Sequence, residues 1–254
     1  MRRWLIALIL LTACRCASAG TDEIILQLEY EPSFTVLMTS QKPWGRVPEF
    51  TLYSNGTAIW MSEEGQRSAL READLPEEDV LALVQRVRDA GLERIDSYTD
   101  LCMRHNETEQ VCVADASTGV LRFRNASGEL EVRRNYATFA RSSEALAAVR
   151  GILERFDWQP SHQYIGRFAT LVVVDASNDA SETEAHPFPL DPALLEGTDE
   201  RVHWLPSDPY RLLVESLPGN VGWFRVEHAG RFYDIVLIPW VPGSDFRTEM
   251  KSSG

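Results

Sequence analysis

The chain has 254 residues, of which 44% are hydrophobic, and this apolar content excludes an intrinsically disordered protein. The length suits one large domain or two small ones with a sizeable core. With 38 acidic and 25 basic residues the formal charge is −13, and such a surface repels nucleic acid and anionic lipid.

Residues 1–19 have the pattern of a secretory signal peptide. Arg2 and Arg3 precede an almost wholly apolar run at 4–13, which is too short to cross a bilayer as a helix of about 20 residues. The pattern therefore predicts export. Removal of the signal leaves 22 basic and 38 acidic residues, a charge of −16.

Two cleavage sites are compatible with this signal. The small side chains at 17–19 predict cleavage before Gly20, whereas the sequence from Leu11 to Cys14 resembles the lipobox of bacterial lipoproteins, in which the cysteine is lipidated. Cleavage before Gly20 leaves one pair of cysteines, and cleavage before Cys14 leaves Cys16 as an odd thiol. The motif favours a lipid anchor at Cys14 and the cysteine count opposes it, so both sites stay open.

Cys102 and Cys112 are the only cysteines after the signal region. In an oxidising compartment we expect them to form a disulfide, which would stabilise the fold by roughly 2.5–3 kcal/mol on the chain-entropy model. The alternative adds His105 as a metal ligand between them, but a fourth ligand at the usual zinc spacing is missing.

The first part of the exported chain is predicted to be β-rich. Residues 23–30 and 34–39 have the composition of strands. Within residues 50–61, two β-rich arms flank Asn55 and Gly56, which predicts a hairpin with a type I′ turn and positive φ at both turn residues.

A helix is predicted after this hairpin. Asp74 is its expected N-cap, Glu77 completes a capping box, and Gly91 ends it with Leu92 as the hydrophobic partner. Its apolar stripe at helical spacing comprises Val80, Leu81, Val84 and Val87.

A second hairpin followed by a helix is predicted between residues 111 and 156. The expected strands are 111–114, 120–124 and 129–134. Arg122 and Arg124 would face Glu129 and Glu131 across an antiparallel pair. Ser142 is the expected cap of a helix whose apolar stripe comprises Leu146, Val149, Leu153 and Phe156.

The C-terminal part has a possible linker at 158–161 and then a buried strand at 168–174. A short helix is expected at 208–217, and the last hairpin has its arms at 221–227 and 231–238. These elements predict an α+β fold with antiparallel sheets built from hairpins, two main helices and one short helix. The expected division is a signal peptide (1–19), a hairpin–helix domain (20–160) and a smaller α+β region (161–254) that packs on it.

No motif identifies a reaction. The five histidines lack metal-ligand spacing, and the sequence has no nucleophile motif, so we predict no catalytic residue, metal or cofactor. The acidic loop with Asp175, Asp179, Glu182 and Glu184, followed by His186, is the best metal candidate, but it lacks the calcium-loop glycine and is predicted to be a solvated loop.

Exposed tryptophans are candidates for a binding surface. Most of the six after the signal lie in β-rich or apolar contexts, which favours packing in the core. Trp44, between Pro43 and Gly45 in a loop, is the best candidate for an exposed binding residue.

Short motifs resemble a loose group of bacterial exported proteins and lipoproteins of unknown function. The motifs are the hairpin at 48–59, the helix start at 75–78, and the pairs at 91–92 and 97–98. The resemblance covers about half of the chain. It implies a bacterial exported protein and brings no activity.

Three functions are compatible with these features. The first is a non-enzymatic binding or structural module of the bacterial envelope, either lipid-anchored or released. The second is an exported hydrolase whose catalytic residues are dispersed in the sequence. The third is an inhibitor or immunity-type partner of a secreted protein. Another protein is the expected kind of partner, and a membrane would be reached only through a lipid on Cys14.

Overall fold

The structure is a computed structural model that describes residues 23–31, 47–64, 67–95, 98–100, 102–104, 110–112, 118–125, 128–135, 139, 143–175, 184–196 and 201–243. The described part contains three helices and two large, mostly antiparallel sheets, so the predicted α+β fold is confirmed. The strand expected at 34–39 lies outside the described residues.

The first sheet has eight strands with β1 near its centre. In spatial order they are β10 (His162–Gln163), β4 (Arg67–Asp74), β3 (Thr57–Glu64), β2 (Phe50–Tyr53), β1 (Ile24–Glu31), β8 (Thr118–Asn125), β9 (Gly128–Asn135) and β5 (Tyr98–Asp100). β5 pairs with β9 in parallel, and the other neighbours are antiparallel. β1 therefore joins the β2–β3 hairpin on one side to the β8–β9 hairpin on the other.

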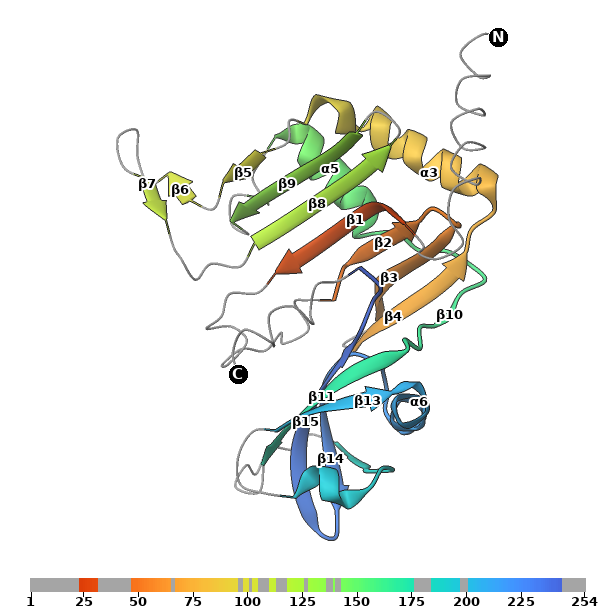
Figure 1. Ribbon diagram of the computed structural model, residues 1–254, viewed down its shortest axis with the longest axis vertical. Helices are drawn as coiled ribbons and strands as arrows, with labels where there is room; N and C mark the ends of the chain where they lie inside the picture. Colours follow the sequence, from red (N-terminus) through yellow and green to blue (C-terminus); the bar gives the residue numbers. More distant parts are fainter. Residues whose placement is uncertain are drawn as a thin grey trace.

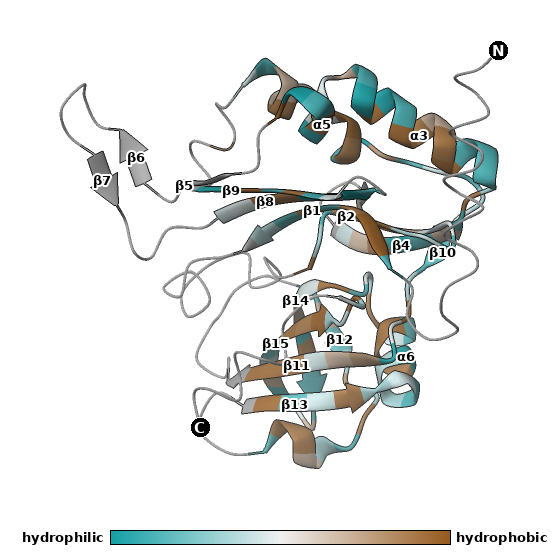
Figure 2. Cartoon of the chain, turned by 45° about the horizontal axis from the view of Figure 1, so that its top comes forward, coloured by the Kyte–Doolittle hydropathy of each residue, from teal (hydrophilic) through white to brown (hydrophobic). Residues whose placement is uncertain are grey.

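Helices α3 (Glu77–Asp89) and α5 (Glu144–Leu153) cover one face of this sheet, with their apolar sides turned toward it (Figures 1 and 2). The core between them includes Phe156, whose ring lies 4.9 Å from Phe50 and 5.0 Å from Trp60, both edge-on. The predicted stripe of α5 is buried. In α3 the buried residues are Val80, Leu83 and Val87, whereas Leu81 and Val84 of the predicted stripe are only partly buried.

Both predicted N-caps need correction. Asp74 is the last residue of β4, and its carboxylate accepts a hydrogen bond from the Thr57 hydroxyl at 2.9 Å, so α3 begins after Pro76 without a side-chain cap. In α5 the cap is Ser143, not Ser142, and it accepts from the Leu146 N–H. Gly91 ends α3 as predicted, with φ +104, before the short 3-10 helix η1 (Leu92–Arg94).

The predicted type I′ turn at Asn55 and Gly56 is wrong. Tyr53 C=O accepts from the Gly56 N–H at 3.0 Å, and only Gly56 has positive φ, which is the arrangement of a three-residue hairpin loop. A turn with two positive φ values occurs instead in the last hairpin, at Ala229 (+50°) and Gly230 (+74°).

The second sheet has five strands, and α6 (Ser207–Ser216) with the 3-10 helix η2 (Pro192–Leu195) packs on one face of it. In spatial order the strands are β12 (Ala185–Pro187), β14 (Gly222–His228), β15 (Arg231–Pro239), β11 (Phe168–Asp175) and β13 (Arg201–Pro206). A separate two-stranded ribbon, β6 (Cys102–Arg104) and β7 (Gln110–Cys112), extends away from the body beyond β5 (Figure 1).

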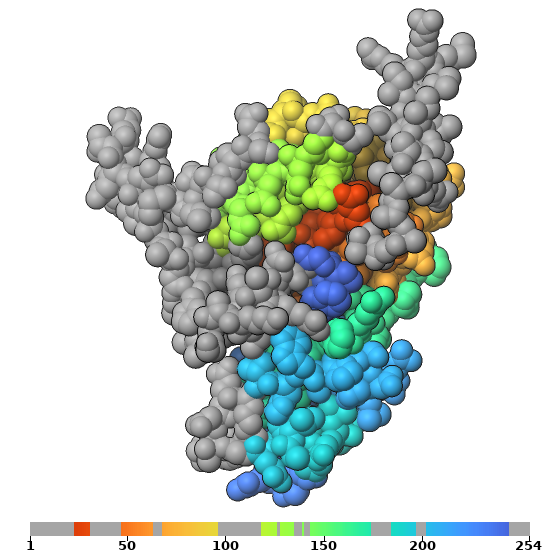
Figure 3. Space-filling model, viewed as in Figure 1, coloured from red at the N-terminus to blue at the C-terminus, as the bar shows by residue number. Residues whose placement is uncertain are grey.

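A third core lies between the two sheets. It combines side chains of the first sheet with Val221, Val236, Ile238 and Val241 from the C-terminal region. The last described residues lie against the first sheet (Figure 3), where Tyr53 donates its hydroxyl to the Pro242 carbonyl at 2.8 Å.

Asn220 joins the two sheets through its fully buried side chain. Its Oδ1 accepts from the Leu70 N–H at 2.8 Å, and its Nδ2 donates to the carbonyls of Leu70 and Tyr164 at 3.1 and 2.7 Å. The Tyr210 hydroxyl donates to the Asn220 carbonyl. Burial raises the pKa of Tyr164 and of Tyr210, so both phenols stay protonated and act as donors.

We expect Asn220→Ala to lower the free energy of unfolding by about 3 kcal/mol, because the Leu70 N–H and the Tyr164 carbonyl lose the hydrogen bonds that Asn220 makes to them. Urea unfolding followed by circular dichroism measures this change. Gln85→Ala is the matched control, since the Gln85 amide donates to Asp89 at an exposed site, and its effect should stay within about 0.5 kcal/mol. Equal effects for the two variants would contradict the role of Asn220.

Candidate functional site

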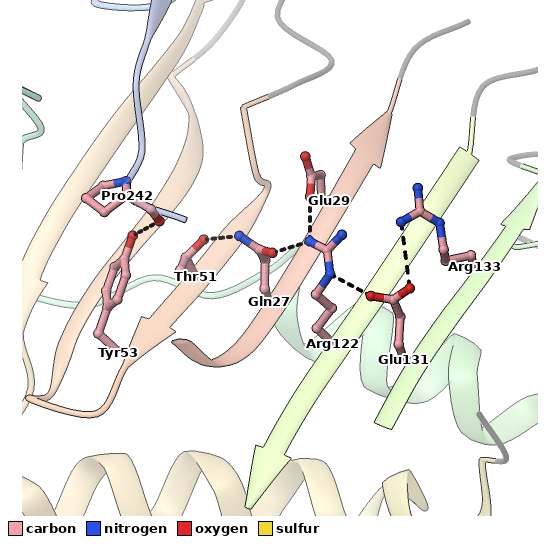
Figure 4. Close-up of polar contacts among 8 residues, drawn as sticks. All are labelled: Gln27, Glu29, Thr51, Tyr53, Arg122, Glu131, Arg133 and Pro242. Carbon is pink, nitrogen blue, oxygen red and sulfur yellow. Dashed lines mark hydrogen bonds and ion pairs between the residues drawn. The ribbon is translucent and has the colours of Figure 1, made fainter. Parts of the chain in front are cut away.

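The face of the first sheet opposite the helices carries a partly buried polar network centred on Arg122 of β8 (Figure 4). Its Nη1 donates to Gln27 Oε1 at 2.6 Å and to Glu29 Oε2 at 2.9 Å, and its Nε donates to Glu131 Oε2 at 2.9 Å. Gln27 Nε2 in turn donates to the Thr51 hydroxyl at 3.4 Å. The network therefore links β2, β1, β8 and β9 across the sheet.

Arg122 is held in its charged state. Burial alone would lower the pKa of the Arg122 guanidinium, but hydrogen bonds to Glu131 and Glu29 outweigh burial and raise it. Glu29 is buried, with 7% of its surface exposed, and Glu131 also pairs with Arg133 at 3.6 Å. Because opposite charges face each other throughout, the arrangement favours rigid strand pairing over proton transfer.

A second arginine on the same strand repeats this pattern at the surface. Arg124 donates to Glu23 at 2.6 Å and to Glu129 at 2.9 Å, but about half of each of these side chains is exposed. The predicted pairs Arg122–Glu131 and Arg124–Glu129 are thus confirmed in register and in contact.

The second sheet has an apolar face that is only partly covered. We call this side, which carries Val172, Val202, Trp204, Trp223, Phe232 and Val236, the apolar face. Its register places Val202, Val172, Val236 and Trp223 in one row across β13, β11, β15 and β14. Val236 is buried against the first sheet, but the ends of the row are not.

Four of the five exposed large apolar side chains in the described part lie on this apolar face. Their exposed fractions are 41% for Val202, 41% for Trp204, 42% for Trp223 and 41% for Phe232. The expectation that most tryptophans pack in the core therefore fails for Trp204 and Trp223, because the first sheet covers only the middle of the apolar face.

A buried ion pair lies among these side chains. Arg225 donates through Nε and Nη2 to the two carboxylate oxygens of Asp234 at 2.9 and 3.1 Å, and its side chain is only 5% exposed. Since the two residues are directly opposite in β14 and β15, the pair fixes the register of these strands beside Trp223.

The predicted site residues are only partly within the described structure. The backbones of Cys102 and Cys112 lie opposite each other in β6 and β7, but their side chains are outside the described part, so the disulfide stays a prediction. The lipidation candidate Cys14 and the candidate binding residue Trp44 also lie outside it. So does most of the acidic loop at 175–186.

Histidines are not brought together with nucleophiles in the described ranges. His162 of β10 lies 3.3 Å from Glu72 of β4, and within those ranges no histidine is hydrogen-bonded to a serine or threonine. Burial raises the pKa of the Glu72 carboxyl, although the neighbouring His162 opposes this shift.

Among the described residues, no group of three or more histidine, cysteine, aspartate or glutamate side chains is arranged to hold a metal ion. No helix in that part of the chain has the length and apolar character needed to cross a bilayer.

Comparison with known proteins gave no match to a protein family model, to a curated protein or to a solved structure.

Replacing Arg122 tests the polar network. We expect Arg122→Met to lower the free energy of unfolding by about 2–3 kcal/mol, because Glu29 and Gln27 are left buried without their cationic donor. Chemical denaturation measures the loss.

Arg124→Met is the matched control, with the same pairing pattern at the surface, and should cost no more than about 1 kcal/mol. An equal loss of unfolding free energy in both variants would contradict a stronger contribution from the more buried Arg122 pairs.

Proposed function

We propose that this chain is an exported protein of the bacterial envelope that works as a non-enzymatic binding module for another protein. The observation that carries the proposal is the apolar face of the second sheet, where Val202, Trp204, Trp223 and Phe232 are all exposed. Clustered exposed apolar side chains mark protein interaction sites, and tryptophan and phenylalanine are enriched in such sites.

The position of these side chains also supports a binding surface. They come from three strands of a sheet whose opposite face is packed by α6 and η2, so their backbone is held rigidly. The Arg225–Asp234 pair fixes the register of β14 and β15 next to them. A rigid surface loses little conformational entropy on association.

The charge of the exported chain narrows the class of partner. A net charge of −16 after removal of the signal opposes binding to nucleic acid and to anionic lipid. The exposed aromatic and aliphatic side chains favour a protein partner instead. A lipid on Cys14 would hold the chain close to a membrane-bound partner.

The intact mass of the protein purified from its envelope fraction tests export. We expect a mass that begins either at lipid-bearing Cys14 or at Gly20, and that lies two hydrogen masses below the fully reduced value because Cys102 and Cys112 are joined. An unprocessed mass beginning at Met1 would contradict export, and free thiols at both cysteines would contradict the disulfide.

Photocrosslinking in living cells tests the binding surface. A photoreactive amino acid placed at position 204 should give a discrete adduct with another envelope protein, because Trp204 lies on the proposed contact. Adducts are detected by gel shift and identified by mass spectrometry.

Position 212 is the control site for this experiment. Leu212 is the fifth exposed large apolar side chain, at 48%, and it lies on α6 instead of the apolar face. The proposal requires a position-204 adduct that is absent at position 212. If neither site gives an adduct, or both give the same one, the apolar face is not the binding surface.

A further inference from the structure

The strand pair of β14 and β15 places two carboxylates on the apolar face. Trp223, Arg225 and Glu227 are alternate residues of β14, so their side chains lie on the same side of the sheet. Asp234 of β15 is the register partner of Arg225. Phe232 is the register partner of Glu227. The carboxylates of Asp234 and Glu227 therefore lie beside the exposed aromatic side chains but have different neighbours.

The first of these carboxylates is neutralised within the chain. Arg225 donates through Nε and Nη2 to the two oxygens of Asp234 at 2.9 and 3.1 Å, and its side chain is 5% exposed. One guanidinium thus occupies both oxygens of the carboxylate. Because this pair has no net charge, it does not neutralise Glu227 two residues further along β14.

The second carboxylate, that of Glu227, has apolar neighbours on both adjacent strands. Its register partners are Phe232 on β15 and Pro187 on β12, and all three residues are exposed. Among the residues that the structure describes, none forms an ion pair or a hydrogen bond with the Glu227 side chain. Glu227 is therefore an uncompensated negative charge within a largely apolar surface.

A partner that covers this surface must supply a cation. Glu227 is solvated while it is exposed, and a protein that packs on Phe232 and Trp223 would remove water from its carboxylate. A buried carboxylate without a cation opposes binding, whereas a paired one favours the partner that carries the cation. The charge of Glu227 therefore selects among the proteins that could cover the apolar side chains.

Arginine has the chemistry that this arrangement requires. Its methylene groups can cover apolar surface while its guanidinium reaches a charged group. The guanidinium forms paired hydrogen bonds to a carboxylate and stacks on aromatic rings. The exposed ring of Phe232 lies opposite Glu227, so one arginine side chain can contact both.

A second copy of this chain does not supply that cation from the same face. The Arg225 guanidinium of such a copy is already bonded to its own Asp234. Two exported chains would also each have a charge of −16 and repel each other. The charge complementarity therefore favours a different protein with a basic side chain.

We propose that the apolar face binds a segment of another envelope protein in which an arginine lies beside apolar side chains, and that this arginine pairs with Glu227. This proposal rests on the proposed function and names the chemistry of the partner. The guanidinium donates to the Glu227 carboxylate, and the arginine methylenes contact Phe232. The neighbouring apolar side chains of the segment cover Trp223.

Photocrosslinking from position 223 of the full chain tests the contact, because this position lies on the same face without replacing Glu227. Glu227→Gln removes the charge and keeps the shape of the side chain. We expect the yield of the adduct with an envelope protein to fall about five- to tenfold, as a charge-assisted hydrogen bond becomes a neutral one. Glu227→Arg should lower the yield more than tenfold, because it places like charges opposite each other.

Glu215→Gln and Glu215→Arg are the matched controls. Glu215 is exposed on α6, which packs on the other face of the second sheet, so these variants change the net charge equally without altering the apolar face. Their adduct yields should stay within about twofold of the parent chain. Thermal unfolding checks that all four variants are folded, and Glu227→Gln alone decides the test if Glu227→Arg unfolds early.

A charge swap gives the most specific result. Replacing the arginine of the crosslinked partner segment with glutamate should restore the adduct of Glu227→Arg. Equal yields for the Glu227 and Glu215 variants overturn the arginine contact but leave the protein-binding function standing. A crosslinked segment that lacks arginine, or an adduct at position 204 without one at 223, has the same consequence.

Other outcomes overturn the binding function as well. These are the absence of an adduct at both positions 204 and 223 in the chain with Glu227 intact, and adducts formed only with lipid or with a second copy of this chain.

Discussion

The buried side-chain amide of Asn220 links the two sheets by hydrogen bonds. It occupies the hydrogen-bonding groups of Leu70 on β4 as a neighbouring strand would, and it binds the Tyr164 carbonyl as well. Only an amide supplies an acceptor and two donors on one planar group, so a carboxylate or an aliphatic side chain cannot replace it. Apolar packing of Val236 and Ile238 against the first sheet then holds the interface closed.

This contact determines what remains exposed. On the same face of the first sheet, the Arg122 network pairs its charges internally, through Glu29 and Glu131. Conversely, the first sheet covers only the middle of the apolar face, around Val236, and leaves Val202 and Trp223 at the ends of the same row exposed. The partial overlap of the two sheets therefore leaves apolar side chains exposed at both ends of this row.

Local patterns predicted much of the fold. Alternation and helical spacing located the main strands and helices, and charge pairing placed Arg122 opposite Glu131. The errors arose where a side chain binds a residue outside its local motif. Asp74, for example, accepts a hydrogen bond from the Thr57 hydroxyl instead of capping a helix N-terminus. No local pattern predicts the role of Asn220, because its partners are 150 and 56 positions away in the sequence. The exposure of Trp204 likewise depends on the order of the strands in the sheet, which the periodicity of the sequence does not predict.

The partly covered apolar face shows how the same constraint bears on association. Val202, Trp204, Trp223 and Phe232 are each 41–42% exposed on a sheet whose opposite face is packed by α6 and η2. Clustered apolar side chains of this kind favour contact with another surface. The formal charge of −13 opposes association between copies of the chain, because like charges repel. The acidity of the chain therefore limits self-association through a face whose apolar side chains would otherwise promote it.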